Sequence, residues 1–372
     1  MLIGIDASRA NKLQKTGVEW YSYHLIEQFK KMDQEDRFFL YTNEPLRGPL
    51  AVKPRNFEEK VLNWPIPKTW TLSRLSYEMK FAKEIPDVLF VPAHTIPLLN
   101  PRRSVVTIHD IGFEHFKEGY KFADRFYHKF IIHFIKRFAS RIITVSNFCK
   151  DDIVKTYGIP AEKISVVHNG FDNLNYRFIE NAKEKLKEKY KIDFPFVNFV
   201  GRLELKKNTP RLVEAFGVFK QKHPENKHKL ILIGRKGFGF EAVEQKIREY
   251  SLNQDVVFPG YVVEEDMPLF HSASDLFIFP SLFEGFGIPV LEAMACRVPV
   301  ICSNTTSLPE VAGEAALQFD PQNITQMVAR MEQVLFNPEV SESLRIKGIE
   351  RAKLFSWEKC ARETLKIVTG NW

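Results

Sequence analysis

Short apolar runs alternate with helical patterns along the first half of the chain, and this alternation limits the possible folds most strongly. The runs predict strands at 3–6, 38–42, 88–91, 105–108, 142–145 and 165–167. Amphipathic patterns between them predict helices at 17–31, 121–139 and 147–157. Strands that alternate with helices form a parallel sheet, because each crossover helix packs back onto it. The sequence therefore predicts an α/β fold of the doubly wound class.

The second half repeats the alternation and predicts a second domain of the same class. Its predicted strands are 196–200, 230–233, 256–258, 276–279 and 300–302. A chain of 372 residues, 44% of them hydrophobic, is long enough for two cores. The stretch 173–191 is highly charged and has no apolar run, so we place the junction there and expect domains at 1–172 and 173–355. Two such sheets that meet with their carboxyl ends would leave a cleft between them.

Residues 281–292 combine two carboxylates with a glycine-flanked turn. A predicted strand precedes them and a helical pattern at 288–295 follows, so Glu284 lies in a loop and Glu292 on a helix. If the helix begins near Phe286, its N–H groups and dipole favour an anion such as phosphate, which Gly285 and Gly287 would let approach. Eight helical residues rise about 12 Å, more than the roughly 5–9.5 Å between glycosidase carboxylates. The pair thus suits a long ligand, with a sugar near Glu284, a pyrophosphate at the helix start and a ribose near Glu292.

Each glutamate also has an ordinary explanation, because such residues often cap helices or face solvent. A second segment favours a binding role. Arg202 and Lys207 follow the predicted strand 196–200, and open α/β sheets bind ligands at the carboxyl ends of their strands. Arginine offers a fork to phosphate oxygens and lysine a point charge. Alternatively, Arg202 and Lys207 are two solvated residues of a loop without a ligand. Their position between a predicted strand and the helical pattern at 209–220 favours binding.

These segments, in this order, resemble the retaining glycosyltransferases of family four, which have the two-domain GT-B fold. The resemblance rests on residues 200–202 with Lys207, on Glu284 to Glu292 as a Glu-x7-Glu motif, and on residues 299–301 and 307–311. Loops of the first half match as well, at Gly17, 109–110, 144–146 and 168–172. Nearly the whole chain is covered. Around 284–310 the sequence looks most like the mannosyl- and rhamnosyltransferases of bacterial surface polysaccharides such as lipopolysaccharide.

The resemblance implies roles for particular residues. Catalysis would fall to His109, Arg202, Lys207 and Glu284, and donor binding to Gly17, Val262, Phe286, Gly287 and Glu292. His109 would lie beside the donor sugar, and the backbone of the segment 260–262 would meet the base. A structural histidine and an ordinary helix N-terminus are the alternatives for His109 and Gly17. The family also implies a last helix, 356–372, that crosses back to the first domain.

The reaction expected from these residues is metal-independent. No Asp-x-Asp triplet occurs, so Arg202, Lys207 and the helix start would stabilise the leaving diphosphate, without metal or cofactor. The expected donor is a nucleoside diphosphate sugar, GDP-mannose before dTDP-rhamnose, and the acceptor a hydroxyl of a glycan or lipid-linked saccharide. The family implies retention, and no segment clearly supplies a carboxylate nucleophile, so we adopt front-face attack. A sugar phosphorylase, a nucleotide-sugar hydrolase or epimerase on the same fold, and an inactive nucleotide-sugar-binding subunit stay open.

Charge and targeting signals bear on partners. From Lys117 to Arg141 the chain carries net charge +5 among several phenylalanines, which suits a helix that touches anionic lipid or a lipid-linked acceptor. The sequence favours the other interpretation, in which the aromatic side of this helix packs in the core and its lysines face water. The net charge of +7 is spread out and no nucleic-acid module occurs, so no nucleic-acid partner is expected. Without a signal peptide or long apolar stretch, the protein is expected in the cytoplasm, with peripheral contact at the inner face of the membrane as an option.

Overall fold

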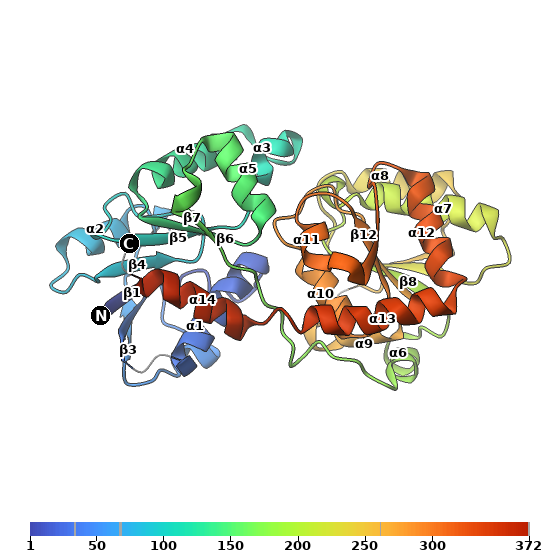
Figure 1. Cartoon of the computed structure of the whole chain (residues 1–372), viewed down its shortest axis with the longest axis horizontal. Helices are drawn as coiled ribbons and strands as arrows, with labels where there is room; N and C mark the ends of the chain where they lie inside the picture. Colours follow the sequence, from blue (N-terminus) through green and yellow to red (C-terminus); the bar gives the residue numbers. More distant parts are fainter. Residues whose placement is uncertain (33–34, 67–68, 261, 371–372) are drawn as a thin grey trace. The chain divides into compact units, whose positions relative to one another are not determined.

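The computed structural model describes residues 1–32, 35–66, 69–260 and 262–370, which divide into two units (Figure 1). One unit comprises Met1–Gly170 and the C-terminal segment from Trp357, and the other Phe171–Ser356. The charged stretch expected to contain the junction belongs to the second unit. There it forms α6 (Ala182–Tyr190), which buries Ala182 and Leu186. Its high charge reflects one exposed helix face rather than a linker.

The described part of the first unit has a seven-stranded, all-parallel sheet in the order β3-β2-β1-β4-β5-β6-β7. Most strand residues are buried because helices cover both faces. The strands are β1 (Leu2–Asp6), β2 (Arg37–Thr42), β3 (Phe57–Val61), β4 (Val88–Val91), β5 (Ser104–Ile108), β6 (Arg141–Thr144) and β7 (Ile164–Val166). The doubly wound α/β prediction is confirmed here.

Strand β3 was not predicted, because its sequence Phe-Glu-Glu-Lys-Val lacks an apolar run. It lies at the edge of the sheet, where charged residues are tolerated and protect against pairing with other chains. Its one buried anchor is Phe57, whose ring stacks on that of Phe38 with centroids 4.2 Å apart. The register places these two residues opposite each other.

Helices cover the two faces of this sheet unequally (Figure 1). One face carries α2 (Arg74–Phe81), α3 (Gly112–His115), α4 (Phe122–Phe138) and α5 (Asn147–Tyr157). The other carries α1 (Gly17–Met32) and the last helix, α14 (Trp357–Thr369), whose Trp357 ring stacks on His24 with centroids 4.9 Å apart. Short 3-10 turns lie at η1 (Gly48–Ala51), η3 (Lys117–Gly119) and η4 (Ala161–Lys163). The expectation that α4 buries its aromatic side holds only for Tyr127 and Phe134, which pack against the core beside the buried Ile131, Ile132 and Ile135. Phe122, Phe126 and Phe130 are exposed.

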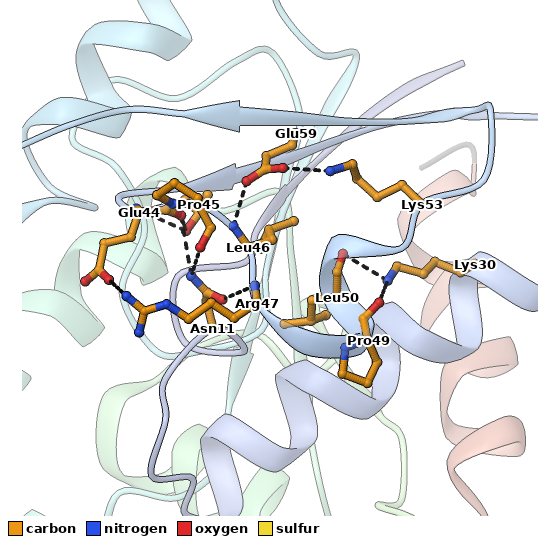
Figure 2. A network of polar contacts seen from close by, with 11 residues as sticks. Asn11, Lys30, Glu44, Pro45, Leu46, Arg47, Pro49, Leu50, Lys53 and Glu59 are labelled. Carbon is orange, nitrogen blue, oxygen red and sulfur yellow. Dashed lines mark hydrogen bonds and ion pairs between the residues drawn. The ribbon is translucent and has the colours of Figure 1, made fainter.

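A polar network fixes the segment after β2 (Figure 2). The buried Lys30 Nζ donates to the carbonyl oxygens of Pro49 at 3.1 Å and Leu50 at 3.2 Å. The carboxylate of Glu59 accepts from the Leu46 N–H at 2.7 Å and from Lys53 Nζ at 2.6 Å. The side chain of Asn11 bonds the same segment, so the loop between β1 and α1 is tied to it. This loop leads to Gly17.

In the second unit the described strands form a six-stranded parallel sheet in the order β10-β9-β8-β11-β12-β13. They are β8 (Phe196–Val200), β9 (Lys229–Ile233), β10 (Val256–Val257), β11 (Leu276–Phe279), β12 (Val300–Ser303) and β13 (Ala316–Phe319). The edge strand β13 was not predicted. The neighbours β8 and β11 have adjoining carboxyl ends, from which the loops with Lys207 and Glu284 emerge.

Helices cover both faces of the second sheet as well (Figure 1). One group consists of α7 (Thr209–Lys222), α8 (Phe240–Glu249) and α12 (Ile324–Leu335). The other consists of α6, α9 (Met267–Ala273), α10 (Ile288–Ala295) and α13 (Pro338–Ala352), with α11 (Leu308–Ala312) packed beside α10. The turns η5 (Leu205–Lys207), η6 (Glu264–Asp266) and η7 (Gly313–Ala315) complete the unit.

Candidate functional site

Two of the predicted residues form an ion pair at the carboxyl edge of the second sheet. Lys207, the last residue of η5, places its Nζ 2.5 Å from Oε1 of Glu284, in the loop between β11 and α10. Their side chains are only 20% and 10% exposed. The same ammonium lies 5.4 Å from the centre of the Phe279 ring. A mostly buried cation and carboxylate thus lie together where the two loops meet.

The loop of Glu284 is held by residues that the sequence prediction did not include in the site. The buried Ser307 hydroxyl lies 3.0 Å from the carbonyl oxygen of Glu284 and 2.9 Å from that of Phe286. The Glu284 N–H donates to Oγ1 of Thr306 at 3.2 Å. On the other side, the Leu282 N–H donates to the Lys206 carbonyl oxygen at 3.0 Å. Ser307 lies in a segment that carried the family resemblance, and that was the available signal.

The helix predicted at 288–295 is confirmed as α10 (Ile288–Ala295), so the condition set for the anion site, a helix start near Phe286, is not met. The N-cap of α10 is Gly287, with φ of 106°, and a Cβ there would come within 2.6 Å of Leu308 Cδ2. This close approach requires glycine. Phe286 is buried and its ring meets that of Phe355 edge-on at 5.8 Å. Any donor contact of Phe286 is thus left to its backbone.

The later start also changes the geometry of the Glu-x7-Glu motif. Glu292 is the fifth residue of α10, and Glu284 precedes the helix. The helical rise from Ile288 to Glu292 is about 6 Å, so the axial offset of about 12 Å expected for eight helical residues does not apply. Pro289 offers no N–H, and the Val290 N–H bonds the Gly287 carbonyl at 3.0 Å. The helix start therefore has fewer donors for an anion than an uninterrupted first turn.

Glu292 stands in acidic surroundings. Burial, and then the charges of Glu264 and Asp172, raise the pKa of its carboxyl well above the ordinary value. The Tyr176 hydroxyl donates to Glu264 Oε1 at 2.6 Å and lies in the same group. Among the described residues no lysine or arginine forms an ion pair with Glu292. Such a carboxyl suits a ligand that donates hydrogen bonds, as a diol does.

Arg202 lies on a loop that is bonded to its neighbour by backbone hydrogen bonds. The Leu203 N–H donates to Arg235 O and the Gly237 N–H to Leu203 O, each at 2.9 Å. Gly234 has φ of 151°, and a Cβ there would lie 1.8 Å from the Gly201 carbonyl oxygen. A Cβ at Gly237 would lie 2.7 Å from Arg202 Cγ. The glycine loop after β9 therefore packs against the loop after β8 and sets the position of Arg202.

The guanidinium of Arg202 is available to a ligand. Its side chain is 64% exposed, and Nη1 lies 3.6 Å from Oε2 of Glu204. An exposed pair of this length holds the side chain weakly. Arg202 and Lys207 thus lie on one loop but have different partners, Glu204 and Glu284.

His109 follows β5 in the first unit. Its Nε2 lies 3.0 Å from the Pro92 carbonyl oxygen, and its ring meets Tyr21 edge-on at 4.7 Å. Because a carbonyl oxygen only accepts, Nε2 carries the proton and Nδ1 is left as an acceptor. Burial lowers the pKa of the imidazole, which keeps it neutral. His94 lies close by and was missed. Burial and the charges of His128 and His109 lower its pKa to about 3.

The remaining predicted residues make fewer contacts. Gly17 starts α1, and the Thr16 N–H donates to Glu19 Oε2 at 3.1 Å, as in a capping box. Nothing lies within 4 Å of a Cβ built at Gly17, so the space beside it is open. Val262 is partly buried in the loop before η6. Its neighbour Tyr261, in the same predicted segment, lies outside the described residues.

Comparison with known proteins gives matches over most of the chain. The family model "Glycosyltransferase Family 4" matches residues 15–173, and "Glycosyl transferases group 1" matches residues 181–351. The O-antigen chain mannosyltransferase B of Escherichia coli is 31% identical over 272 residues, which cover 71% of this chain and 69% of that protein. The serotype-specific mannosyltransferase WbdA of Escherichia coli is 26% identical over 278 residues, and the match spans 73% of this chain and 33% of WbdA.

A solved structure shows the same fold over the full length. It is Anabaena Alr3699/HepE in complex with UDP and glucose, with a TM-score of 0.74 at 18% identity. The alignment covers 100% of this chain and 99% of that one.

Proposed function

Since this chain belongs to glycosyltransferase family 4, we propose that it transfers mannose from GDP-mannose to a hydroxyl of a polysaccharide or lipid-linked saccharide. The family resemblance and the assignment as a glycosyltransferase are confirmed by the family matches and the Escherichia coli relative. The α/β GT-B fold is confirmed by the family matches and the structural neighbour. Mannose is favoured because both relatives described above are named mannosyltransferases. GDP-mannose is the donor that carries this sugar in activated form.

One observation supports the location of the donor in the second unit. The Lys207–Glu284 pair stands at the adjoining carboxyl ends of β8 and β11, the edge where open α/β sheets bind ligands. The exposed Arg202 lies on the same loop as Lys207. In our proposal the two cations bind the diphosphate, and Glu284 accepts hydrogen bonds from sugar hydroxyls. The half-buried Glu292 accepts from the ribose diol.

In the proposed reaction, each of these residues has a separate role. As the glycosidic bond breaks, charge develops on the departing phosphate oxygen, and Lys207 and Arg202 stabilise that charge. The acceptor hydroxyl attacks from the same face and its proton passes to this oxygen, so that GDP leaves protonated and configuration is retained. Glu284 is already paired with Lys207, so it is held in place before substrate arrives. The neutral His109 accepts a hydrogen bond from a sugar hydroxyl through Nδ1.

Transfer assays with purified full chain test this function. The chain is incubated separately with GDP-mannose and dTDP-rhamnose, and with a saccharide acceptor that carries a lipid-like aglycone. We expect α-linked mannose in the product by NMR and no transfer from dTDP-rhamnose. Calorimetry with GDP, UDP and dTDP gives a second measure, and GDP should bind most tightly. Transfer of rhamnose alone, or tightest binding of dTDP, would contradict the proposed donor.

The place of the reaction is also part of the proposal. A lipid-linked acceptor lies in a bilayer, so the enzyme would work in the cytoplasm at the inner face of the membrane. Within the residues that the structure describes, no helix is long and apolar enough to cross a membrane.

A further inference from the structure

Phenylalanine recurs at every fourth position along α4, and four of these five side chains are exposed. Phe122 is 81% exposed, Phe126 67%, Phe130 49% and Phe138 53%, while Phe134 is half-buried and packs against the core. Residues four apart are neighbours on a helix surface, and the rings of Phe134 and Phe138 are 4.5 Å apart. The opposite side of α4 is anchored in the core by Ile131, Ile132 and Ile135. The aromatic row is therefore a surface feature of a firmly packed helix.

Basic side chains accompany this row. Within α4 the ionised residues are Arg125, Lys129, Lys136 and Arg137 against Asp124. Lys129 pairs with Glu114 at 3.0 Å. Lys136 donates to the Tyr157 carbonyl oxygen, and no acidic residue in the described part of the chain forms an ion pair with it. At the C-terminal end, burial and then the charges of Arg137 and Arg141 lower the pKa of Lys163. Cations thus crowd this end of the helix.

We propose that the outer side of α4 docks the protein onto a bilayer of anionic phospholipid. The α4 surface, defined here as Lys121, Phe122, Phe126, Phe130, Arg137 and Phe138, combines the two requirements of interfacial binding. Aromatic rings enter the boundary between headgroups and acyl chains, and lysine and arginine bind the phosphates. The charge complementarity selects a negatively charged bilayer over a neutral one. In Figure 1 this helix covers one face of the sheet, on the outside of its unit.

The α4 surface would bring the enzyme to a lipid-linked acceptor. This role of the surface rests on the proposed function. Docking itself requires neither donor nor acceptor. It can therefore be measured without catalysis, and a failure of one proposal is distinguishable from a failure of the other.

The test is cosedimentation of full chain with vesicles of phosphatidylcholine, either pure or with phosphatidylglycerol at about a third of the lipid. One variant carries Phe122→Ser and Phe126→Ser, and another Lys121→Glu and Arg137→Glu. Matched controls carry Leu174→Ser with Leu354→Ser, which are 82% and 53% exposed, and Lys187→Glu with Lys353→Glu. A basic side chain near an anionic surface contributes about a fivefold change in binding. We expect both α4 variants to bind mixed vesicles at least tenfold more weakly, and both controls to bind as wild type does.

Three outcomes would overturn the inference. They are equal binding to neutral and mixed vesicles, no binding to either, and wild-type binding by both α4 variants. If the variants changed only the sedimentation coefficient of the free protein, the α4 surface would serve a second copy of the chain instead. Transfer to a water-soluble acceptor without vesicles should be the same in wild type and α4 variants, and its absence in wild type would count against the proposed function alone.

Discussion

Lys207 Nζ and Glu284 Oε1 lie 2.5 Å apart although 77 residues separate them in the chain. The contact exists because β8 and β11 are neighbours in the sheet and their following loops emerge at the same edge. Both side chains are mostly buried, so each partner offsets the desolvation of the other. The free protein thus holds a cation and a carboxylate in place for a charged, hydroxylated ligand.

Lys207→Met should reduce transfer by about 10²–10³, because one preorganised stabiliser of the leaving diphosphate is lost. It should also lower the melting temperature, since Glu284 is left without its cation. Adding Glu284→Gln to Lys207→Met should recover stability but not activity, which separates the two roles. Steady-state kinetics and thermal melts of Lys207→Met, Glu284→Gln and the double variant measure this. Normal turnover by both single variants would show that the pair is only structural.

Glu292→Gln should weaken calorimetric binding of GDP, whereas Glu284→Gln should spare GDP binding and impair transfer. The reason is the proposed division between ribose and sugar, with Glu292 on the helix and Glu284 in the loop before it. Arg297→Gln, close by on the chain and exposed, is a control that should leave GDP binding unchanged. Equal GDP affinity in all four proteins would contradict the ribose assignment.

The raised pKa of Glu292 should make the stability of the protein depend on pH. Its pKa is raised in the folded state, so the folded protein holds this proton more tightly than the unfolded chain. Its contribution to stability is therefore complete below the unfolded pKa of about 4.3 and is lost as the pH rises through the folded pKa. Glu292→Gln removes this loss. The melting temperature of the variant relative to wild type should rise from pH 4 upward, and a constant difference would contradict the shift.

Gly234→Ala should be strongly destabilising, because a Cβ would lie 1.8 Å from the Gly201 carbonyl oxygen at a φ of 151°. Backbone strain and overpacking together predict about 2–6 kcal/mol. Gly260→Ala is the matched control, with φ of 81° and nothing within 4 Å, for which conformational strain alone predicts about 1–2 kcal/mol. Urea denaturation of both variants measures the difference. Equal urea midpoints for the two variants would show that the loop after β9 accommodates the added Cβ without strain.

His109→Phe should keep the fold and reduce kcat/KM by about tenfold, as expected for one lost hydrogen bond. Burial lowers the imidazole pKa below its ordinary value, so the protonated form of His109 should contribute less to the pH–rate profile than that of an exposed histidine. Nitrogen NMR should show the proton on Nε2 near neutral pH. A titration of His109 near pH 6.5 would contradict its buried, neutral state.

The strand and helix pattern, and with it the fold class, could be predicted from the sequence alone. Buried parallel strands need continuous apolar runs and crossover helices need an amphipathic period, so both leave a local signal. Glu284, Glu292, Arg202 and Lys207 could be selected by their places after strands and on a helix. The edge strand β3 escaped, because an edge strand needs no apolar run and its pairing with β2 depends on long-range contact.

Only the tertiary structure decided how these residues act on one another. The Lys207–Glu284 pair, the bonds from Thr306 and Ser307 to the Glu284 loop, and the packing of Gly237 against Arg202 all join distant segments, for which no local period exists. The bounds of α10 were predicted correctly, but its first turn does not extend back to Phe286, since Leu308 approaches Gly287 closely there. The aromatic row of α4 was assigned to the core because hydrophobic spacing does not reveal which side of a helix meets the sheet. Three isoleucines took that place, with Phe134 beside them, and the other four phenylalanines were left outside.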